Sequence, residues 1–493
     1  MITFVASLCL LIVGYALYGL FVERVFGADQ NRKTPCYTMA DGVDYVPMPT
    51  WKVYLIQFLN IAGTGPIFGA IQGILFGPAA YLWIVLGCVL GGAVHDYLSG
   101  MISLRKGGVS QPILVGQEMG RRMKLFVMVY VIILLIMVGA VFVTTPAGLL
   151  SNLTAGWGKW TTPMFWSVII FLYYMLATVL PIDKLIGRIY PVFGLALLIM
   201  AVGLLWGIFT QDGTVPEITG AFTNHHPSSP IPLFPGICIT IACGAVSGFH
   251  ATQSPMMVRC IKNEKLCRPV FYGAMITEGV VALIWAAAAI KFGDSLQVPG
   301  DTPYEKLLFA MSDDGSINPA IIVNDICNSW MGSVGAVLAM LGVIVAPITT
   351  GDTALRSARL IAYDFFHIQD TGVVKRLLIS LPIFAVVALF MMIRFDVLWR
   401  YFAWGNQTLS IFTLWAVTIW LARHGKLFIV SLVPTVWMML TCTSYIIVAK
   451  EGLNLSPVIG NILACVVTLV SLIAFSRWYY RGKRRGFRVD SEA

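Results

Sequence analysis

Long apolar runs alternate with short polar stretches along the whole chain. At about 20 apolar residues per membrane-spanning helix, this pattern predicts roughly thirteen helices. The expected helices cover residues 2–21, 53–76, 79–104, 124–150, 163–181, 189–209, 233–258, 271–291, 331–355, 377–393, 398–421, 427–449 and 456–477. The pattern therefore predicts an all-α polytopic membrane protein.

Two of the expected helices are interrupted by Gly, Pro and polar residues where a plain membrane helix carries Leu, Val or Ile. The interruptions are 60–66 (NIAGTGP) and 247–255 (SGFHATQSP). An unpaired backbone group costs several kcal/mol in lipid, so such a break is tolerated only against protein or a wet cavity. Breaks in matching helices of two half-chains indicate the substrate site of a secondary transporter.

The helices fall into two sets of five, each of which opens with a broken helix. We expect repeat 1 to cover 53–209 and repeat 2 to cover 233–421, with additional helices at 1–21 and 427–477. An odd number of spans inverts the second set relative to the first. This is the 5+5 inverted repeat of the leucine-transporter-like fold, in a single transmembrane transporter domain over 1–493.

Composition agrees with this membrane assignment. The chain is 58% hydrophobic and 12% charged, whereas soluble proteins carry about 25% charged residues. The net charge of +9 does not predict nucleic-acid binding, because the basic residues are divided among many short loops. The first apolar run lacks a cleavage site and is expected to be a retained helix.

The basic residues predict the orientation of the chain. Of the 33 Lys and Arg residues, 27 follow the odd-numbered helices of the series and 6 follow the even-numbered ones. Because cytoplasmic loops carry an excess of Lys and Arg, we expect the N-terminus outside and the C-terminus in the cytoplasm. The basic cluster at 477–488 is most simply a stop signal at an anionic leaflet.

The first break supplies candidate substrate ligands. Gly63 and Gly65 free backbone groups, and Asn60 and Thr64 add polar side chains beside them. A half-helix beginning near Pro66 would present its N–H groups to an anion. The glycines continue at four-residue intervals to Gly77, so a helix-packing face is also consistent with them. That face is compatible with a homo-oligomer but does not require one.

The second break is the counterpart of the first. Ser247, His250 and Gln253 are the candidate substrate ligands there. His250 is an ionisable group deep in an apolar span, which makes it a candidate functional residue. The structural alternative is a neutral imidazole that bridges two helices.

Two further segments supply candidate groups for ion or proton coupling. His95 and Asp96 lie within helix 79–104, where Asp96 exchanges a proton or is paired with His95 or a distant Arg. Thr349 and Thr350 could hold a small cation against carbonyls of the first broken helix. Asp352 is a further candidate, although Arg356 four residues later can pair with it structurally. Glu278 is expected near the inner end of its helix, where it could reach water.

No nucleotide-binding loop, metal-ligand spacing or nucleophile elbow is present in the sequence. We therefore expect no cofactor and no metal site, with H⁺ or Na⁺ as the coupling ion. An enzyme is not expected, because adjacent residues such as His95 and Asp96 point about 100° apart on a helix. A nutrient sensor that binds its ligand without transport is the alternative function.

Five strings in the sequence resemble the carbon starvation protein A (CstA) family, in its short form. They are NIAGTGPIFGA (60–70), GAVHDYLSGMISL (92–104), SGFHATQSPMMVRC (247–260), GAMITEGVVALIWAAAA (273–289) and GVIVAPITTGDTALRSARL (342–360). The resemblance covers essentially the whole chain. It implies a bacterial inner-membrane transporter related to the amino acid–polyamine–organocation superfamily.

Members of this family are linked to uptake of peptides and of pyruvate, with proton-coupled symport proposed. The resemblance therefore implies symport of a small carboxylate or a peptide. Better studied members are longer, tend to have Gln where this chain has His95, and differ around Gln253. The resemblance therefore implies the fold of this chain more directly than its substrate.

Overall fold

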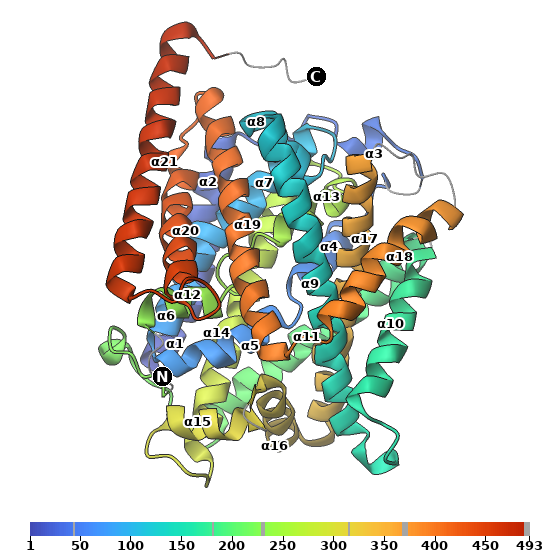
Figure 1. The fold of residues 1–493 in the computed structure, drawn as a ribbon, viewed down its shortest axis with the longest axis vertical. Helices are drawn as coiled ribbons and strands as arrows, with labels where there is room; N and C mark the ends of the chain where they lie inside the picture. The colour runs from blue at the N-terminus through green and yellow to red at the C-terminus, as the bar shows by residue number, and fades with distance from the viewer. Residues whose placement is uncertain (43–44, 180–181, 228–231, 314–315, 367–372, 488–493) are drawn as a thin grey trace.

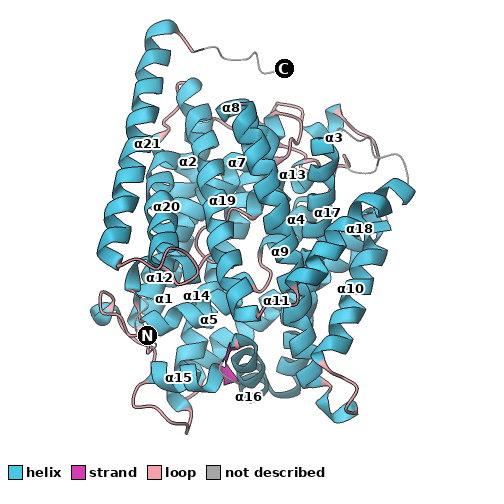
Figure 2. Ribbon diagram, viewed as in Figure 1, coloured by secondary structure: helices cyan, strands magenta, loops and turns pink. Residues whose placement is uncertain are grey.

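The computed structural model describes all residues except 43–44, 180–181, 228–231, 314–315, 367–372 and 488–493. Almost all of the described chain is helical, and a two-residue strand pair, β1 (Ser312–Asp313) and β2 (Ser316–Ile317), is antiparallel (Figure 2). The first half contains α1 (Ile2–Val13), η1 (Gly14–Tyr18), α2 (Gly19–Phe26), α3 (Pro35–Thr38), α4 (Thr50–Ile61), α5 (Gly65–Gly73), η2 (Ile74–Phe76), α6 (Ala79–Leu86), η3 (Gly87–Gly92), α7 (Ala93–Arg105), α8 (Gln111–Met119), α9 (Arg121–Leu153), η4 (Ala155–Trp157), α10 (Pro163–Val179), α11 (Ile182–Thr210) and η5 (Ile218–Gly220).

The second half continues with α12 (Leu233–Thr240), α13 (His250–Val258), η6 (Glu264–Leu266), η7 (Arg268–Gly273), α14 (Ala274–Ser295), α15 (Pro303–Met311), α16 (Pro319–Ala339), η8 (Met340–Val345), α17 (Ala346–Phe366), α18 (Val373–Phe390), α19 (Phe395–Arg423), α20 (Ile429–Val448) and α21 (Pro457–Arg485).

Each of the expected spans coincides with a helix or a broken helix, which confirms the all-α polytopic fold. Among the described residues, seven continuous helices are long and apolar enough to cross a membrane, and the bent pair α4 and α5 adds an eighth. The other expected spans are helical but shorter, broken or richer in polar residues; of expected helix 163–181, residues 180–181 lie outside the described residues. Helix 331–355 is longer than expected: it follows a kink at Gly332 and runs to Phe366.

The two broken spans run in opposite directions. In Figure 1, α4 lies nearer the upper end of the molecule and α5 the lower end, whereas α12 lies low and α13 high. An inverted repeat requires this arrangement of its first helices. The repeat boundaries themselves, 53–209 and 233–421, stay a prediction.

The broken spans lie at the centre of the bundle. α13 packs against α4, α7 and α17, and α14 packs against α4 and α5. Of the apolar window in α14, 89% is buried, against 22% in α21. Its alanine run, Ala286–Ala289, favours helix and allows this close approach. α20 and α21 flank the bundle on one side and α10 and α18 on the other (Figure 1).

Widened π-helical turns precede two of the candidate segments. η3 lies directly before α7, which carries His95 and Asp96, and η8 lies directly before α17, which carries Thr349 and Thr350. Such turns are frequent at functional sites because the extra residue re-aims the side chains that follow. The helix geometry therefore directs attention to the start of α7 and of α17.

Candidate functional site

At the first break, α4 ends at Ile61 and α5 begins at Gly65, with a bend of 49°. Glycine is needed here because side chains from other segments of the same polypeptide approach closely. A Cβ on Gly65 would lie 2.4 Å from Cys243 Sγ, and one on Gly63 would lie 2.9 Å from Phe142 Cζ. The two breaks therefore touch, since Cys243 belongs to the segment between α12 and α13.

Three buried polar side chains surround the first break without hydrogen-bond partners among the described residues. They are Gln57, Asn60 and Thr64, each no more than 1% exposed. A buried polar group left unpaired costs about 1–3 kcal/mol, so native proteins rarely keep several together. These polar groups are therefore available for hydrogen bonds to a ligand or to water.

At the second break, Asn406 of α19 holds the backbone between α12 and α13. Its side-chain oxygen accepts hydrogen bonds from Ser247 Oγ at 3.1 Å and from the N–H of Phe249 at 2.7 Å. Its backbone oxygen accepts from the N–H of Gly248 at 3.1 Å. The backbone of α19 is so close that a Cβ on Gly248 would lie 2.3 Å from Ser410 N.

A chain of ionisable side chains begins where α13 begins. Asp96 Oδ1 lies 2.8 Å from His95 Nδ1, and Asp96 Oδ2 lies 2.8 Å from His250 Nδ1. The other ring nitrogen, His250 Nε2, lies 3.5 Å from Glu278 Oε2. All four side chains are fully buried. The structure thus pairs Asp96 with His95, as one alternative predicted, and adds His250.

Glu278 differs from its expected position. It was expected to reach water near a helix end, but it is 0% exposed and both carboxylate oxygens lack hydrogen-bond donors among the described residues. The expectation was wrong because the depth of a residue was estimated from α14 alone, whereas α4, α5 and α7 cover that face of the helix.

Cys243, His250 and Glu278 place one donor atom each within 4.8 Å of one another. Within the part of the chain that the structure describes, this is the group of His, Cys and carboxylate side chains whose spacing could suit a metal ion. Ligand bonds to zinc are about 2.0–2.3 Å, and the Cys243 sulfur already accepts from Asn406 Nδ2 at 3.4 Å. We assign no ion to this cluster, and the absence of a metal site stays a prediction.

Two substrate candidates remain, Ser247 and Gln253. Ser247 makes a structural hydrogen bond, whereas Gln253 keeps a polar atom without a partner among the described residues. The hydroxyl of Ser247 is used to hold the second break. Gln253 is buried, donates to Thr252 Oγ1 at 2.9 Å, and keeps its carbonyl oxygen without a donor among the described residues. Gln253 therefore joins Gln57, Asn60 and Thr64 as a group available to a ligand.

Of the candidate ion-coupling residues of α17, Thr350 contacts the helix that leads into the first break. Thr350 Oγ1 is 3.1 Å from the carbonyl oxygen of Leu59 in α4 and 3.0 Å from that of Ala346. Thr349 Oγ1 donates to Ala346 O at 2.7 Å. Asp352 lies 3.8 Å from Arg356, and both are buried. The structural alternative for Asp352 is thus present in the fold.

A cavity of about 320 Å³ leads toward the second break. It is lined by α8, α13 and α17 and reaches Thr252, next to Gln253. Polar and charged side chains, including Ser357 and Arg259, line it together with apolar ones. In Figure 1, α8 and α13, which contribute to this lining, are labelled near the upper end of the molecule.

Sequence reasoning missed Gln57 and Asn406. Gln57 lies three residues before Asn60 and so on the same face of α4, which was a usable signal. Asn406 belongs to the polar run Asn406-Gln407-Thr408 within an otherwise apolar helix. Nothing in the sequence says which break such a polar run contacts.

The sequence of this chain is similar to a family of known membrane proteins. The family model of "Carbon starvation protein CstA" matches residues 1–165 and 152–299. An uncharacterized membrane protein of Haemophilus influenzae is 44% identical over 347 residues, which cover 61% of this chain and 94% of that protein.

Two relatives from Escherichia coli carry functional names. The peptide transporter CstA is 27% identical over 66% of this chain and 54% of its own length. The pyruvate/proton symporter BtsT is 28% identical over 70% of this chain and 56% of its own length. The matched part of this chain thus spans about half the length of these relatives, which are transporters rather than enzymes.

A solved structure extends the comparison to the fold. The manganese transporter of Eremococcus coleocola is 13% identical, with a TM-score of 0.57 over 91% of this chain and 99% of that one. At this identity the likeness concerns the fold alone. Nearly the whole bundle therefore has the arrangement of a known membrane transporter.

Proposed function

Because the chain belongs to the carbon starvation protein CstA family, we propose that it is an ion-coupled symporter. It takes up a small carboxylate such as pyruvate, or peptides, across the bacterial inner membrane. The named relatives support both substrate classes. The predicted orientation places the N-terminus outside and the C-terminus in the cytoplasm, on the side where the basic loops lie.

The observation that carries the proposal is the position of His250. Its imidazole lies between two buried carboxylates, Asp96 and Glu278, at the first residue of α13. Two carboxylates that share a dry site are costly to keep ionised together. A proton taken up by this group relieves that cost, and an imidazole can pass it from one nitrogen to the other.

Substrate binding is coupled to this proton through the two breaks. The open polar groups Asn60 and Thr64 lie at the first break, and Gln253 lies one turn after His250 at the second. A substrate carboxylate between them is close to the N-terminal end of α13, where helix N–H groups favour an anion. Movement of either half-helix would change both the substrate ligands and the proton-bearing group.

A sodium-coupled symporter is the second candidate. It is favoured by the contact between Thr350 Oγ1 and the carbonyl of Leu59 at the first break. Hydroxyl and carbonyl oxygens are suitable ligands for a hard cation. In this mechanism Thr349 and Thr350 hold the coupling ion, and the His250 group is a neutral structural bridge.

Uptake of labelled pyruvate into proteoliposomes tests the proposal, with a dipeptide assayed alongside. A pH gradient and a Na⁺ gradient are imposed separately. Accumulation driven by the pH gradient alone supports H⁺ symport, and dependence on Na⁺ favours the second candidate. Binding without accumulation of any substrate would support a nutrient sensor instead.

Variants of Glu278 separate the two ions. For H⁺ symport, Glu278→Gln should lower gradient-driven accumulation at least tenfold while it preserves exchange of substrate across the membrane, because exchange needs no net proton movement. Glu278→Asp should retain part of the accumulation. Thr350→Val is the matched change at the cation candidate, and it should alter Na⁺ dependence only if sodium is the coupling ion.

A further inference from the structure

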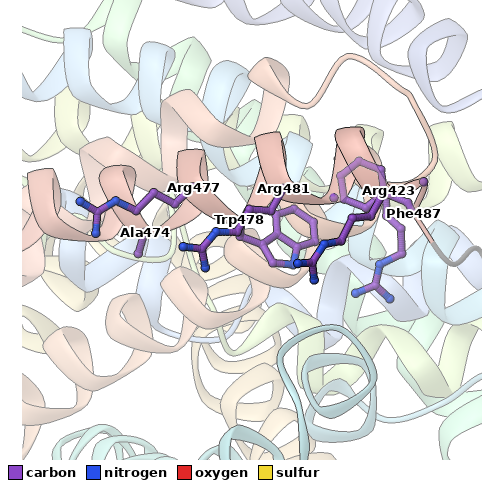
Figure 3. A pocket seen from close by; sticks show the side chains of 9 residues that line it. Arg423, Ala474, Arg477, Trp478, Arg481 and Phe487 are labelled. Atoms are coloured by element: carbon purple, nitrogen blue, oxygen red, sulfur yellow. The ribbon is translucent and has the colours of Figure 1, made fainter.

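A groove of about 660 Å³ lies between the end of α21 and the end of α19. Four arginines from the two helices line it: Arg423, Arg477, Arg481 and Arg485. Figure 3 shows Trp478 among the side chains of Arg477, Arg481 and Arg423. The groove therefore combines a concentrated positive charge with an aromatic surface.

The arginines of α21 form one row. Arg477, Arg481 and Arg485 are spaced four residues apart and so lie on one face, where like charges destabilise a helix. Among the described residues no acidic side chain pairs with these three. Arg423 Nη1 lies 3.2 Å from Glu118 Oε2, so the groove has one acidic neighbour on its α19 side. An anion bound against the row would reduce the repulsion among these three charges.

The position of the groove relative to the expected bilayer indicates the class of anion. α21 has 29 residues, of which about 20 suffice to cross the hydrocarbon core of a bilayer. The apolar part before Arg477 fills that length, so the row of arginines begins where the headgroups lie. Only 22% of the apolar window of α21 is buried in the protein, which leaves most of this window available for contact with lipid. Trp478 is the residue type typical of this interface.

We propose that this groove binds the phosphate headgroup of an anionic phospholipid. Guanidinium groups of Arg477 and Arg481 donate to the phosphate oxygens, as arginine does in other phosphate sites. Arg423 completes the site from α19, the helix whose Asn406 holds the second break. The lipid thereby fastens the peripheral α21 to a helix of the functional site. This inference is independent of the transported substrate.

Thermal unfolding of the full chain in lipid nanodiscs tests the proposal. The discs contain either phosphatidylcholine alone or phosphatidylcholine with 20% phosphatidylglycerol or cardiolipin, about one lipid in five. The wild-type midpoint should rise by several degrees with anionic lipid, because a ligand that binds only the folded state stabilises it. Arg477→Gln combined with Arg481→Gln should lose most of that rise.

The matched control is Lys483→Gln combined with Arg484→Gln. It removes the same charge from the same helix end, but these residues do not line the groove. The control should keep the rise in midpoint. An equal loss in both double variants would show that the surface potential alone acts, and would overturn a defined site.

Two further measurements keep the test decisive. Stabilisation of wild-type protein by inorganic phosphate, to the same degree as by anionic lipid, would indicate a soluble anion and contradict the lipid assignment. If the arginine variant fails to fold, native mass spectrometry of wild-type protein decides. Retention of anionic lipid after zwitterionic lipid is stripped supports the site, and equal loss of both overturns it.

Discussion

The two helix breaks look alike in sequence, yet the structure completes them differently. At the first break, Gln57, Asn60 and Thr64 are buried without partners among the described residues. At the second, Asn406 accepts hydrogen bonds from Ser247, Gly248 and Phe249. The first break therefore leaves polar groups available to a ligand, whereas the second is held firmly by α19.

The ionisable side chains and the unpaired polar side chains also belong mainly to different breaks. The ionisable group His250 starts the half-helix of the firmly held break and contacts Asp96 at 2.8 Å. The open polar groups lie mainly on the other break. The proposed symport needs binding and protonation to influence one another, and in this structure the ionisable group and the open polar groups lie on neighbouring breaks.

The largest expected effect compares glycines at the two breaks. Gly248→Ala places a Cβ 2.3 Å from the backbone nitrogen of Ser410, and should cost about 3 kcal/mol of stability. Gly65→Ala meets the side chain of Cys243 instead and should cost about 1–2 kcal/mol. Thermal unfolding in detergent measures both, and a larger loss for Gly65→Ala would contradict the view that the second break is the more rigid.

The two asparagines give the next comparison. Asn406→Ala leaves the donors of Ser247 and Phe249 without their acceptor and should cost about 2–3 kcal/mol. Asn60→Ala removes a side chain whose amide has no partner among the described residues, so stability should change by less than about 1 kcal/mol. Equal destabilisation by the two variants would remove the distinction between the breaks.

Transport kinetics test whether the open polar groups at the two breaks bind substrate. Asn60→Ala should raise the KM for substrate about fivefold, the equivalent of one lost hydrogen bond worth about 1 kcal/mol. Gln253→Ala should act in the same direction. Uptake assays on variants with wild-type unfolding temperatures provide the measurement. Unchanged uptake kinetics in both would show that the open polar groups do not bind substrate.

The smallest effect concerns the loop that follows the first repeat. Burial lowers the pKa of His226 from its usual 6.5 to about 4, and its ring lies 4.7 Å from that of Phe76 at the end of η2. A lowered histidine pKa adds stability above pH 6.5 that is lost as the pH falls toward 4. His226→Gln should flatten this part of the profile of unfolding temperature against pH. A profile identical to wild type would exclude His226 as its source.

Local features of the sequence predicted a large share of the result. Apolar length and the positions of Gly and Pro identified the spans and both breaks, because a helix in lipid must satisfy its own backbone. The pairing of His95 with Asp96 was one of the alternatives that the sequence left open, and Thr350 lies beside α4. The coupling roles of these residues stay predictions. Glu278 was misplaced in depth, because its surroundings come from helices remote in the sequence.

The sequence by itself determined the class of protein, the helices, the breaks and the family, all of which depend on residues close together in the chain or on matching strings. Only the tertiary structure decided that His250 joins Asp96 to Glu278 and that Asn406 holds the second break. Asp96 and His250 lie 154 residues apart. Helix packing brings such residues together, and neither apolar periodicity nor local propensity specifies which faces meet.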